Sequence, residues 1–537
     1  MRGWRPRVAS ELAWEINALK LPIQLRMLLP IRLKFGIQMH PMKKLILISI
    51  LSVATLAARA ALPQPDLIAQ IHFAGGSTIS AAKNYSALAN EFSSAEAKVL
   101  RAQTADKLAK FFHTWFTQNS GATVVGGATT LRPLLEELQN NEWYLESRNV
   151  SGTAETALAI KTSDTGAQAW QSGLRPYFHN ANFERVNGWL IFRTSVNAPK
   201  ISGNIPALND AWLALDLNWP ALGKFFPAVR ELDLPETKFS VMTTATDFKI
   251  DGKFLFPANL TASLEPWRVP TNTLHQPFVS FTAVRGISKW LDSQPWMADY
   301  RLNPTPNQLF VWALPNLGFQ TFAAIPRPDS ADALRQASAR LSAVLDQAKT
   351  SNELQFPLTL EQTNQQTTLI GLPFIAPYLQ AINSSAGQFL LAGAFPNSPK
   401  SKPLPPDLFT RLGQKNIVFY HWEITAERVP TLLQLSQFTL MVSWHKQLEE
   451  NSAALKWIQS IGGKLGNTVT EVFQTGADEM TFTRKAPGAF TAVELFALAN
   501  WLEADNFPGC DLKMPPRTNK FKKKKSPVPA VAPSAGQ

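Results

Sequence analysis

A serine and a lysine one helical turn apart are the first candidates for chemistry in this sequence. They are the ends of Ser80-Ala81-Ala82-Lys83. On a helix this spacing brings an amine to a hydroxyl, and the amine can then activate the hydroxyl as a nucleophile. The spacing recurs in Ser443-Trp444-His445-Lys446, so chance supplies it readily in this chain.

The Ser80 and Lys83 pair resembles the nucleophile and base of serine acyl-enzymes of the penicillin-binding type. That resemblance implies acyl transfer through Ser80. The supporting Ser-Asp-Asn and Lys-Thr-Gly elements are missing, and Lys161-Thr162-Ser163 is only a partial match. We therefore keep a serine acyl-enzyme as an alternative function and assign no catalytic residue.

Other residue types point to structure rather than to a cofactor. Asp164 and Asp329 occupy matching positions where helices are expected to begin, and an N-cap role explains them. The seven histidines form no metal-binding motif, and Gly121 to Gly127 lacks the lysine of a phosphate loop. We expect neither a metal nor a nucleotide cofactor.

Tryptophan is abundant, with 14 of the 16 residues following Ala61. Exposed tryptophans commonly stack on sugar rings. Trp189 and Trp312 lie inside apolar runs, which favours core packing. Glycan binding remains a second alternative function.

The net charge of +12 is carried by the ends of the chain. Residues 1 to 60 hold ten of the 52 basic residues and seven more follow Leu512, so that 35 basic residues face 38 acidic ones between them. The run Lys522, Lys523, Lys524 and Lys525 could hold an anionic envelope polymer or lipid by charge alone. No specific nucleic-acid motif is present.

The segment from Met42 to Ala60 has the layout of a secretory signal peptide. Two lysines precede an apolar core of about 14 residues, and Ala58-Arg59-Ala60 provides a small-x-small cleavage site. We predict cleavage after Ala60, with no transmembrane helix afterwards. Residues 1–41 are interpreted as a leader or a mis-chosen start.

Cysteine usage favours a bacterial envelope, periplasmic or secreted. Cys510 is the only cysteine, which excludes an intramolecular disulfide. Exported eukaryotic proteins of this size usually carry disulfides.

An internal repeat organises the rest of the chain. Apolar runs closed by Asn-x-Pro-Lys occur 200 positions apart, at Asn197 and Asn397, and Asp164 and Asp329 are 165 apart. Further pairs of segments recur in the same order: 131–138 before Trp143 with 287–291 before Trp296, 157–160 with 322–325, 212–217 with 417–422, and the paired runs 239–243 and 248–256 with 469–473 and 480–483. A turn is expected at Asp251-Gly252 or just before Asp247.

Helices alternate with paired strands and short turns, which predicts an α+β fold with two tandem related units, mainly antiparallel sheets and packed helices. A helix is expected to close each unit, near Leu260 to Trp267 and from Val493 to Leu502, and an extra hairpin and helix are expected within 358–382. Capping-box patterns at Ser93-Ser94-Ala95-Glu96 and Thr491-Ala492-Val493-Glu494 predict helix starts, and Gly476-Ala477-Asp478 predicts a hairpin turn. The predicted organisation is a leader 1–41, a signal peptide 42–60, a helical N-terminal segment 61–130, a first unit 131–267, a linker 268–284, a longer second unit 285–512, and a disordered basic tail 513–537 rich in proline and alanine.

We interpret the sequence as an exported bacterial envelope protein, most simply a non-enzymatic binding or scaffold protein built from a duplicated α+β unit. Duplication without a catalytic constellation motivates this hypothesis. The sequence does not identify a ligand, partner or oligomeric state.

Overall fold

Segments in which buried and partly exposed side chains alternate form the framework of the protein. Between residues 479 and 486, for example, Met480, Phe482 and Arg484 are buried and their neighbours are more exposed. Such alternation puts successive side chains on opposite faces of a sheet.

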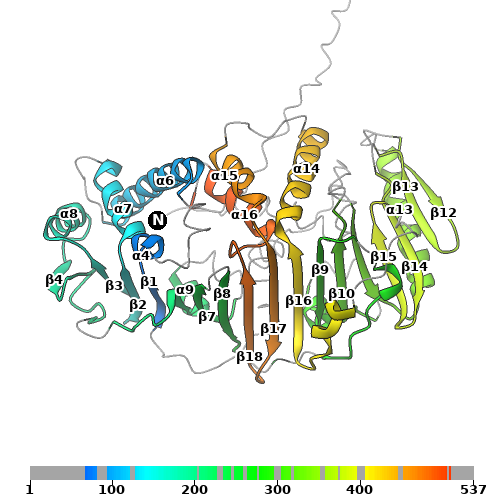
Figure 1. Ribbon diagram of the computed structural model, residues 1–537, viewed down its shortest axis with the longest axis horizontal. Coiled ribbons are helices and arrows are strands. Elements are labelled where there is room, and N and C mark those ends of the chain that lie inside the picture. Colours follow the sequence, from blue (N-terminus) through cyan, green and yellow to red (C-terminus); the bar gives the residue numbers. More distant parts are fainter. Residues whose placement is uncertain are drawn as a thin grey trace, which may run out of the picture.

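The computed structural model has a mixed α+β fold in which one large antiparallel sheet carries a layer of helices (Figure 1), as the sequence predicts. The signal peptide, Cys510, Lys83, Trp296 and the tail lie outside the described residues. The structure describes residues 67–81, 93–120, 127–201, 205–225, 234–243, 247–257, 260, 263–274, 277–294, 304–315, 320–350, 357–372, 375–395, 406–444, 452–504 and 507–508.

The described residues form 18 strands that hydrogen-bond in one continuous antiparallel order. From one edge to the other the strands are β4 (Asn182–Val186), β5 (Trp189–Arg193), β3 (Thr153–Lys161), β2 (Trp143–Val150), β1 (Leu67–Phe73), β6 (Ala211–Leu217), β7 (Glu236–Thr243), β8 (Phe248–Leu255), β18 (Glu479–Ala486), β17 (Asn467–Gln474), β16 (Ile417–Ile424), β9 (Ser280–Arg285), β10 (Gln308–Ala313), β11 (Thr321–Pro326), β15 (Gly387–Gly393), β14 (Tyr378–Ser384), β13 (Gln366–Ile370) and β12 (Thr359–Gln362).

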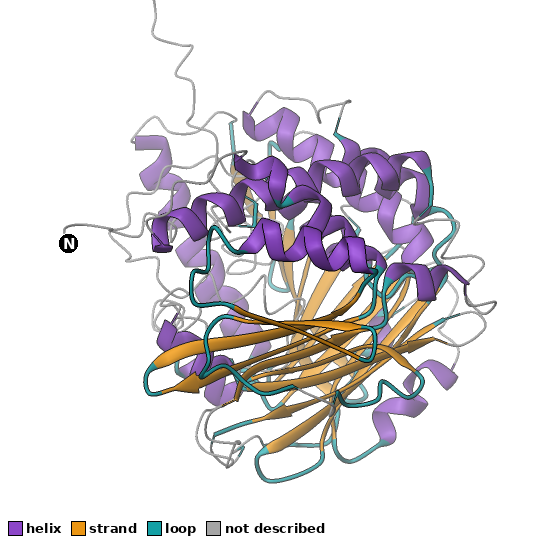
Figure 2. Ribbon diagram, turned by 90° about the vertical axis from the view of Figure 1, so that its left-hand side faces the viewer, coloured by secondary structure: helices purple, strands orange, loops and turns teal. Residues whose placement is uncertain are grey.

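Most of the longer helices lie along one side of this sheet, as Figure 2 shows. In Figure 1 the helices α6, α7, α14, α15 and α16 stand above the strands. The helices are α4 (Gly76–Ala81), α6 (Ala95–Ser120), α7 (Arg132–Asn140), α8 (Asp164–Leu174), α9 (Trp219–Phe225), α11 (Ser288–Asp292), α13 (Ser330–Thr350), α14 (Thr425–Trp444), α15 (Ala453–Gly462) and α16 (Ala492–Glu503), with 3-10 turns η3 (Gly127–Thr130), η4 (Thr271–Thr273) and η5 (Pro406–Gly413).

The strands fall into two groups with the same order. In the first group the order is β4, β5, β3, β2, β1, β6, β7, β8. In the second it is β14, β15, β11, β10, β9, β16, β17, β18, with the hairpin β12–β13 added at the edge. The last strands of the two groups, β8 and β18, pair and make the sheet continuous.

The hydrogen-bond register of the two groups agrees with the spacing of the sequence echoes. Ala157 on β3 pairs with Arg193 on β5. The offsets of 165 and 200 carry this pair onto Phe322 and Gly393, which pair between β11 and β15. The two offsets thus reproduce this strand pair. The bulges described next match β6 with β16 at an offset of 206, one residue more than the echo of 212–217 with 417–422.

A β-bulge occurs at the same place in both groups. The β6–β7 register shifts between Ala211 and Leu213, and the β16–β17 register shifts between Ile417 and Phe419. Leu213 therefore corresponds to Phe419, and residues further along both strands can be matched by counting from them.

Several predicted elements are found. The capping box opening α16 is present, with Thr491 and Glu494 bonded reciprocally. The turn between β7 and β8 lies before Asp247, because Asp251 and Gly252 are inside β8. At α6, Ser94 Oγ accepts a hydrogen bond from Ala97 N–H (3.1 Å).

Other predictions differ from the structure. The segment 61–130 contributes the helices α4 and α6 but also the strand β1, and 268–284 contains the start of β9. The described residues 263–270 form no helix, and those of 358–382 form strands and no helix. Gly75 follows β1 and Gly286 follows β9, and both glycines have a positive φ. The helix after each glycine is α4 in the first group and α11 in the second. The counterpart of α11 is therefore α4, and not the helix predicted at 131–138.

Candidate functional site

The sequence candidates do not come together into a catalytic site. Ser80 lies in the short exposed helix α4, where its hydroxyl donates to the carbonyl of Gly76 (2.8 Å). Lys83 and Lys522 to Lys525 lie outside the described residues. Within the described part of the chain, no three His, Cys, Asp or Glu side chains are grouped to hold a metal ion.

The two aspartates at matching positions are not equivalent caps. Ser163 caps α8 by accepting from Gly166 N–H (3.1 Å), and Asp164 instead pairs with Arg185 (3.0 Å). Asp329 directly precedes α13, and its carboxylate pairs with Arg327 (2.7 Å).

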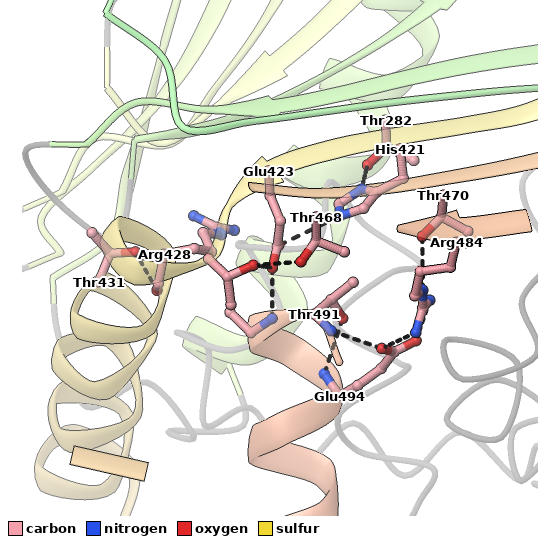
Figure 3. Close-up of polar contacts among 12 residues, drawn as sticks. Thr282, His421, Glu423, Arg428, Thr431, Thr468, Thr470, Arg484, Thr491 and Glu494 are labelled. Atoms are coloured by element: carbon pink, nitrogen blue, oxygen red, sulfur yellow. Dashed lines mark hydrogen bonds and ion pairs between the residues drawn. The ribbon is translucent and has the colours of Figure 1, made fainter. Parts of the chain in front are cut away.

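A cluster of buried charged residues joins the second group of strands to helices α14 and α16 (Figure 3). We call it the charged cluster. It consists of the buried Glu423, Arg428, Arg484 and Glu494 and the partly buried His421, with the threonines Thr282, Thr425, Thr468, Thr470 and Thr491 around them.

Glu423 anchors the start of α16. Its side chain is 2% exposed, and its Oε1 accepts from Ala492 N–H (2.7 Å) and from the Thr425 hydroxyl (2.9 Å). Its Oε2 lies 3.4 Å from Nε2 of His421, without hydrogen-bond geometry. Burial raises the pKa of Glu423, but His421, Ala492 N–H and Thr425 outweigh it and hold that pKa below its ordinary value.

Arg484 and Glu494 form a bidentate ion pair between β18 and α16. The two N–H···O distances are 2.7 and 2.9 Å, and the side chains are 8% and 1% exposed. Arg484 Nε also donates to the Thr470 hydroxyl (2.9 Å), and Glu494 Oε2 accepts from Thr491 N–H (2.8 Å). A fixed fork of this kind orients one element on another.

Arg428 lies near the start of α14 and is 9% exposed. Its Nη1 has no hydrogen-bond partner among the described residues. Burial lowers the pKa of Arg428, and the negative charge of Glu423 opposes that effect. Glu423 thus contacts the first residues of both helices, because Thr425 of α14 and Ala492 of α16 each donate a hydrogen bond to it.

The same row of strand positions is apolar in the first group of strands. Ile71, Leu215, Phe239 and Gly252 oppose one another across β1, β6, β7 and β8. The matching row across β9, β16, β17 and β18 is Thr282, His421, Thr470 and Arg484.

This strand arrangement therefore does not require a polar row. In the first group a Cβ on Gly252 would lie 2.1 Å from the ring of Phe239, so the ring occupies the space beside this glycine. The charged cluster accompanies α16, whereas the described residues 263–270 after β8 contain no helix. We interpret the cluster as the set of polar contacts that hold α14 and α16 against the sheet.

An open polar cleft lies in the first group, where the end of α7, the end of β3, the start of α8 and the β4–β5 turn meet. Its cavity volume is about 550 Å³. We call it the polar cleft. It is lined by Glu137, Asn141, Lys161, Thr162, Ser163, Asn187 and Gly188.

Glu137 is held in place at one wall of the polar cleft. Its Oε2 accepts from the Thr162 hydroxyl and from Trp170 Nε1–H, both at 2.8 Å. Its carboxylate also lies against Gly166 in the first turn of α8, where the helix dipole favours a negative charge.

The position in the second group that matches Thr162 carries a different side chain. The offset of 165 that matches Asp164 with Asp329 also matches Thr162 with Arg327. Arg327 is 3% exposed and donates to the Pro304 carbonyl (2.6 Å) and to Asp329 (2.7 Å). A long, bonded arginine thus occupies the position at which Thr162 leaves space.

Comparison of the chain with known protein families, with curated proteins and with solved structures gives no match. Among the described residues, no helix combines the length and the apolar character needed to cross a bilayer.

Parts of both features are visible in the sequence, but no sequence signal connects those parts. Thr491 and Glu494 were predicted as a capping box, yet the pairing of Glu494 with Arg484 depends on how β18 meets α16. His421 and Glu423 alternate on one strand, which is the sequence signal for a shared face. The Asn187-Gly188 turn of the polar cleft was available as a hairpin signal.

Proposed function

We propose that this chain is an exported, non-enzymatic binding protein of the bacterial envelope, built from a duplicated α+β unit, with the polar cleft as its ligand site. The observation that carries the proposal is the difference between the copies at one matched position. Thr162 leaves the polar cleft open, whereas Arg327 occupies the corresponding place.

Duplication is supported by the matching strand order, register offsets and bulges. Unrelated halves would have no reason to place a bulge at corresponding residues of β6 and β16. An experimental structure in which these bulges do not correspond would contradict the duplication.

A binding rather than a catalytic role is supported by how the buried charges are used. Glu423, Arg484 and Glu494 are engaged in bonds that hold helices to strands. Side chains whose charges are used in these bonds stabilise the fold and are not free to act on a substrate.

Export rests on the signal peptide at residues 42–60. Expression of the full chain in a bacterium should yield a periplasmic or secreted protein whose N-terminal residue is Ala61. A cytoplasmic product that retains residues 42–60 would refute export.

Ligand binding is tested by thermal shift of the mature protein against purified envelope components, including peptidoglycan fragments, neutral glycans and anionic polymers. We expect at least one component to raise the melting temperature. Thr162→Arg, which introduces the residue of the second copy, should abolish that shift. Ser172→Arg, on an exposed part of α8, should preserve it; equal shifts in all three proteins would contradict the proposal.

A further inference from the structure

We infer that the polar cleft takes a neutral saccharide, an inference that rests on the proposed function. Lys161 pairs with Glu142, which also contacts His72 (3.0 Å), and Asp164 pairs with Arg185 (3.0 Å). Lys161, the basic residue that lines the cleft, is thus paired with a carboxylate, which disfavours an anionic ligand. Glu137 has no basic partner among the described residues, but two hydrogen-bond donors engage its carboxylate.

Lys161 is further committed by a ring contact. Its Nζ lies 5.0 Å from the centroid of the Trp189 ring, in addition to its pair with Glu142. An anionic ligand would have to compete with both contacts for this ammonium group. A cation would compete in the same way for Glu137, whose Oε2 already accepts two hydrogen bonds.

Apart from Oε1 of Glu137, the polar groups that remain for a ligand are neutral. The side-chain amides of Asn141 and Asn187 have no hydrogen-bond partner in the described part of the chain, and both line the cleft. An amide offers donors and an acceptor together, and a sugar hydroxyl also donates and accepts. Ser163 and Thr162 also line the cleft, but their hydroxyls are engaged by Gly166 N–H and by Glu137.

The cleft is also preorganised. Asn187 and Gly188 hold positive φ angles of 50° and 82° in the β4–β5 turn. Arg185 ties this hairpin to the start of α8 through the carbonyls of Ser163 (3.2 Å) and Thr162 (3.1 Å). Fixed walls reduce the entropy lost on binding, and a volume of about 550 Å³ accommodates a small oligosaccharide.

The inference is tested by isothermal titration calorimetry of the mature protein with neutral oligosaccharides of hexose and N-acetylhexosamine, and with uronic-acid and sulfated oligosaccharides of the same length. We expect a neutral oligosaccharide to bind. Asn187→Gly keeps the turn but removes the amide, and should weaken binding about tenfold. Asn209→Gly is the matched control, because Asn209 has the same left-handed φ of 50° outside the cleft, and it should bind normally.

Binding of anionic but not neutral oligosaccharides would overturn the inference, and so would neutral binding that Asn187→Gly leaves unchanged. If no saccharide binds while another envelope component still gives a thermal shift that Thr162→Arg abolishes, the saccharide inference fails and the proposed binding function stands. If Thr162→Arg abolishes no shift, both fail.

Discussion

At the residue scale, the bidentate pair of Arg484 and Glu494 has the largest expected effect on stability. Removing one member leaves the other charge buried without its partner. We expect Glu494→Gln to lower the free energy of unfolding by about 3 to 5 kcal/mol. Chemical denaturation followed by circular dichroism measures this loss.

The exposed pair of Lys253 and Glu479 provides the control. Its side chains are 53% and 25% exposed, and we expect Lys253→Met to change the free energy of unfolding by less than about 1 kcal/mol. The double replacement Arg484→Met with Glu494→Leu should recover much of the loss, because neither charge of this pair is then left buried without its partner. If Glu494→Gln costs no more than Lys253→Met, the buried pair does not fasten α16.

Glu423 should make stability depend on pH. Its pKa is held below the ordinary value of 4.5 in the folded protein. A carboxylate with a depressed folded pKa contributes its full stability above the unfolded pKa, and this contribution is lost as the pH falls through the folded pKa.

We therefore expect Glu423→Gln to be less stable than the natural protein at pH 7, with a difference that shrinks below pH 4.5. Guanidinium denaturation between pH 7 and pH 3 measures it. The exposed Glu361 on edge strand β12 serves as control through Glu361→Gln, which should follow the natural protein at every pH. A Glu423→Gln difference that is constant with pH would refute the assigned role.

At the element scale, Gly75 sets how closely β1 approaches the corner between α7 and β2. Its φ is 89°, and an added Cβ would lie 2.5 Å from the carbonyl carbon of Asn141. Gly152 has a similar φ of 85° and no neighbour within 4 Å of such a Cβ.

Alanine at these two positions separates backbone strain from crowding. We expect Gly152→Ala to cost about 1 to 2 kcal/mol from the left-handed backbone alone. Gly75→Ala should cost about 2 to 5 kcal/mol because the Asn141 backbone must also move. Urea denaturation of both variants measures the difference, and equal losses would show that the corner adjusts freely.

Short-range signals made many elements predictable. The capping box of α16, the hairpin turn before β18 and the strand echoes at 165 and 200 residues follow from local chemistry and spacing. The charged cluster was not predictable, because Arg484, Glu494 and Glu423 meet only when β16, β18 and α16 pack together. The helix expected near Leu260 to Trp267 was a wrong prediction from local spacing. The apolar residues Leu260, Leu264 and Trp267 pack in the cores beside the sheet, and the described residues 263–270 are not helical.

At the scale of the whole molecule, the pairing of β8 with β18 joins the two groups of strands into one structure. Besides the hydrogen bonds between β8 and β18, side chains of the two groups also pack together. The ring of Phe482 on β18 lies 5.6 Å from that of Phe239 and 6.2 Å from that of Phe254 in the first group. A shared core of this kind predicts cooperative unfolding.

Phe482→Ala tests this coupling. We expect one unfolding transition in both proteins, with the variant less stable by about 3 kcal/mol. Hydrogen exchange should quicken in β7 as well as in β17. Two separable transitions, or faster exchange confined to the second group, would contradict cooperative unfolding.

The order of the strands was only partly accessible from the sequence. The recurrence of elements predicted two related units, but it contained no information on how they meet. Asp251 and Gly252 were one candidate turn, whereas both lie within β8 and face β18. The extra hairpin predicted within 358–382 is present as β12 and β13, and it extends the sheet at one edge.

The most direct test of the account is a crystal structure of the mature protein soaked with the neutral oligosaccharide that binds most tightly. We predict density for a sugar ring between the end of α7 and the β4–β5 turn, in contact with Asn141 and Asn187, and no density beside Arg327. A sugar bound elsewhere in the structure, or bound beside Arg327 as well, would contradict the assignment of the polar cleft as the ligand site.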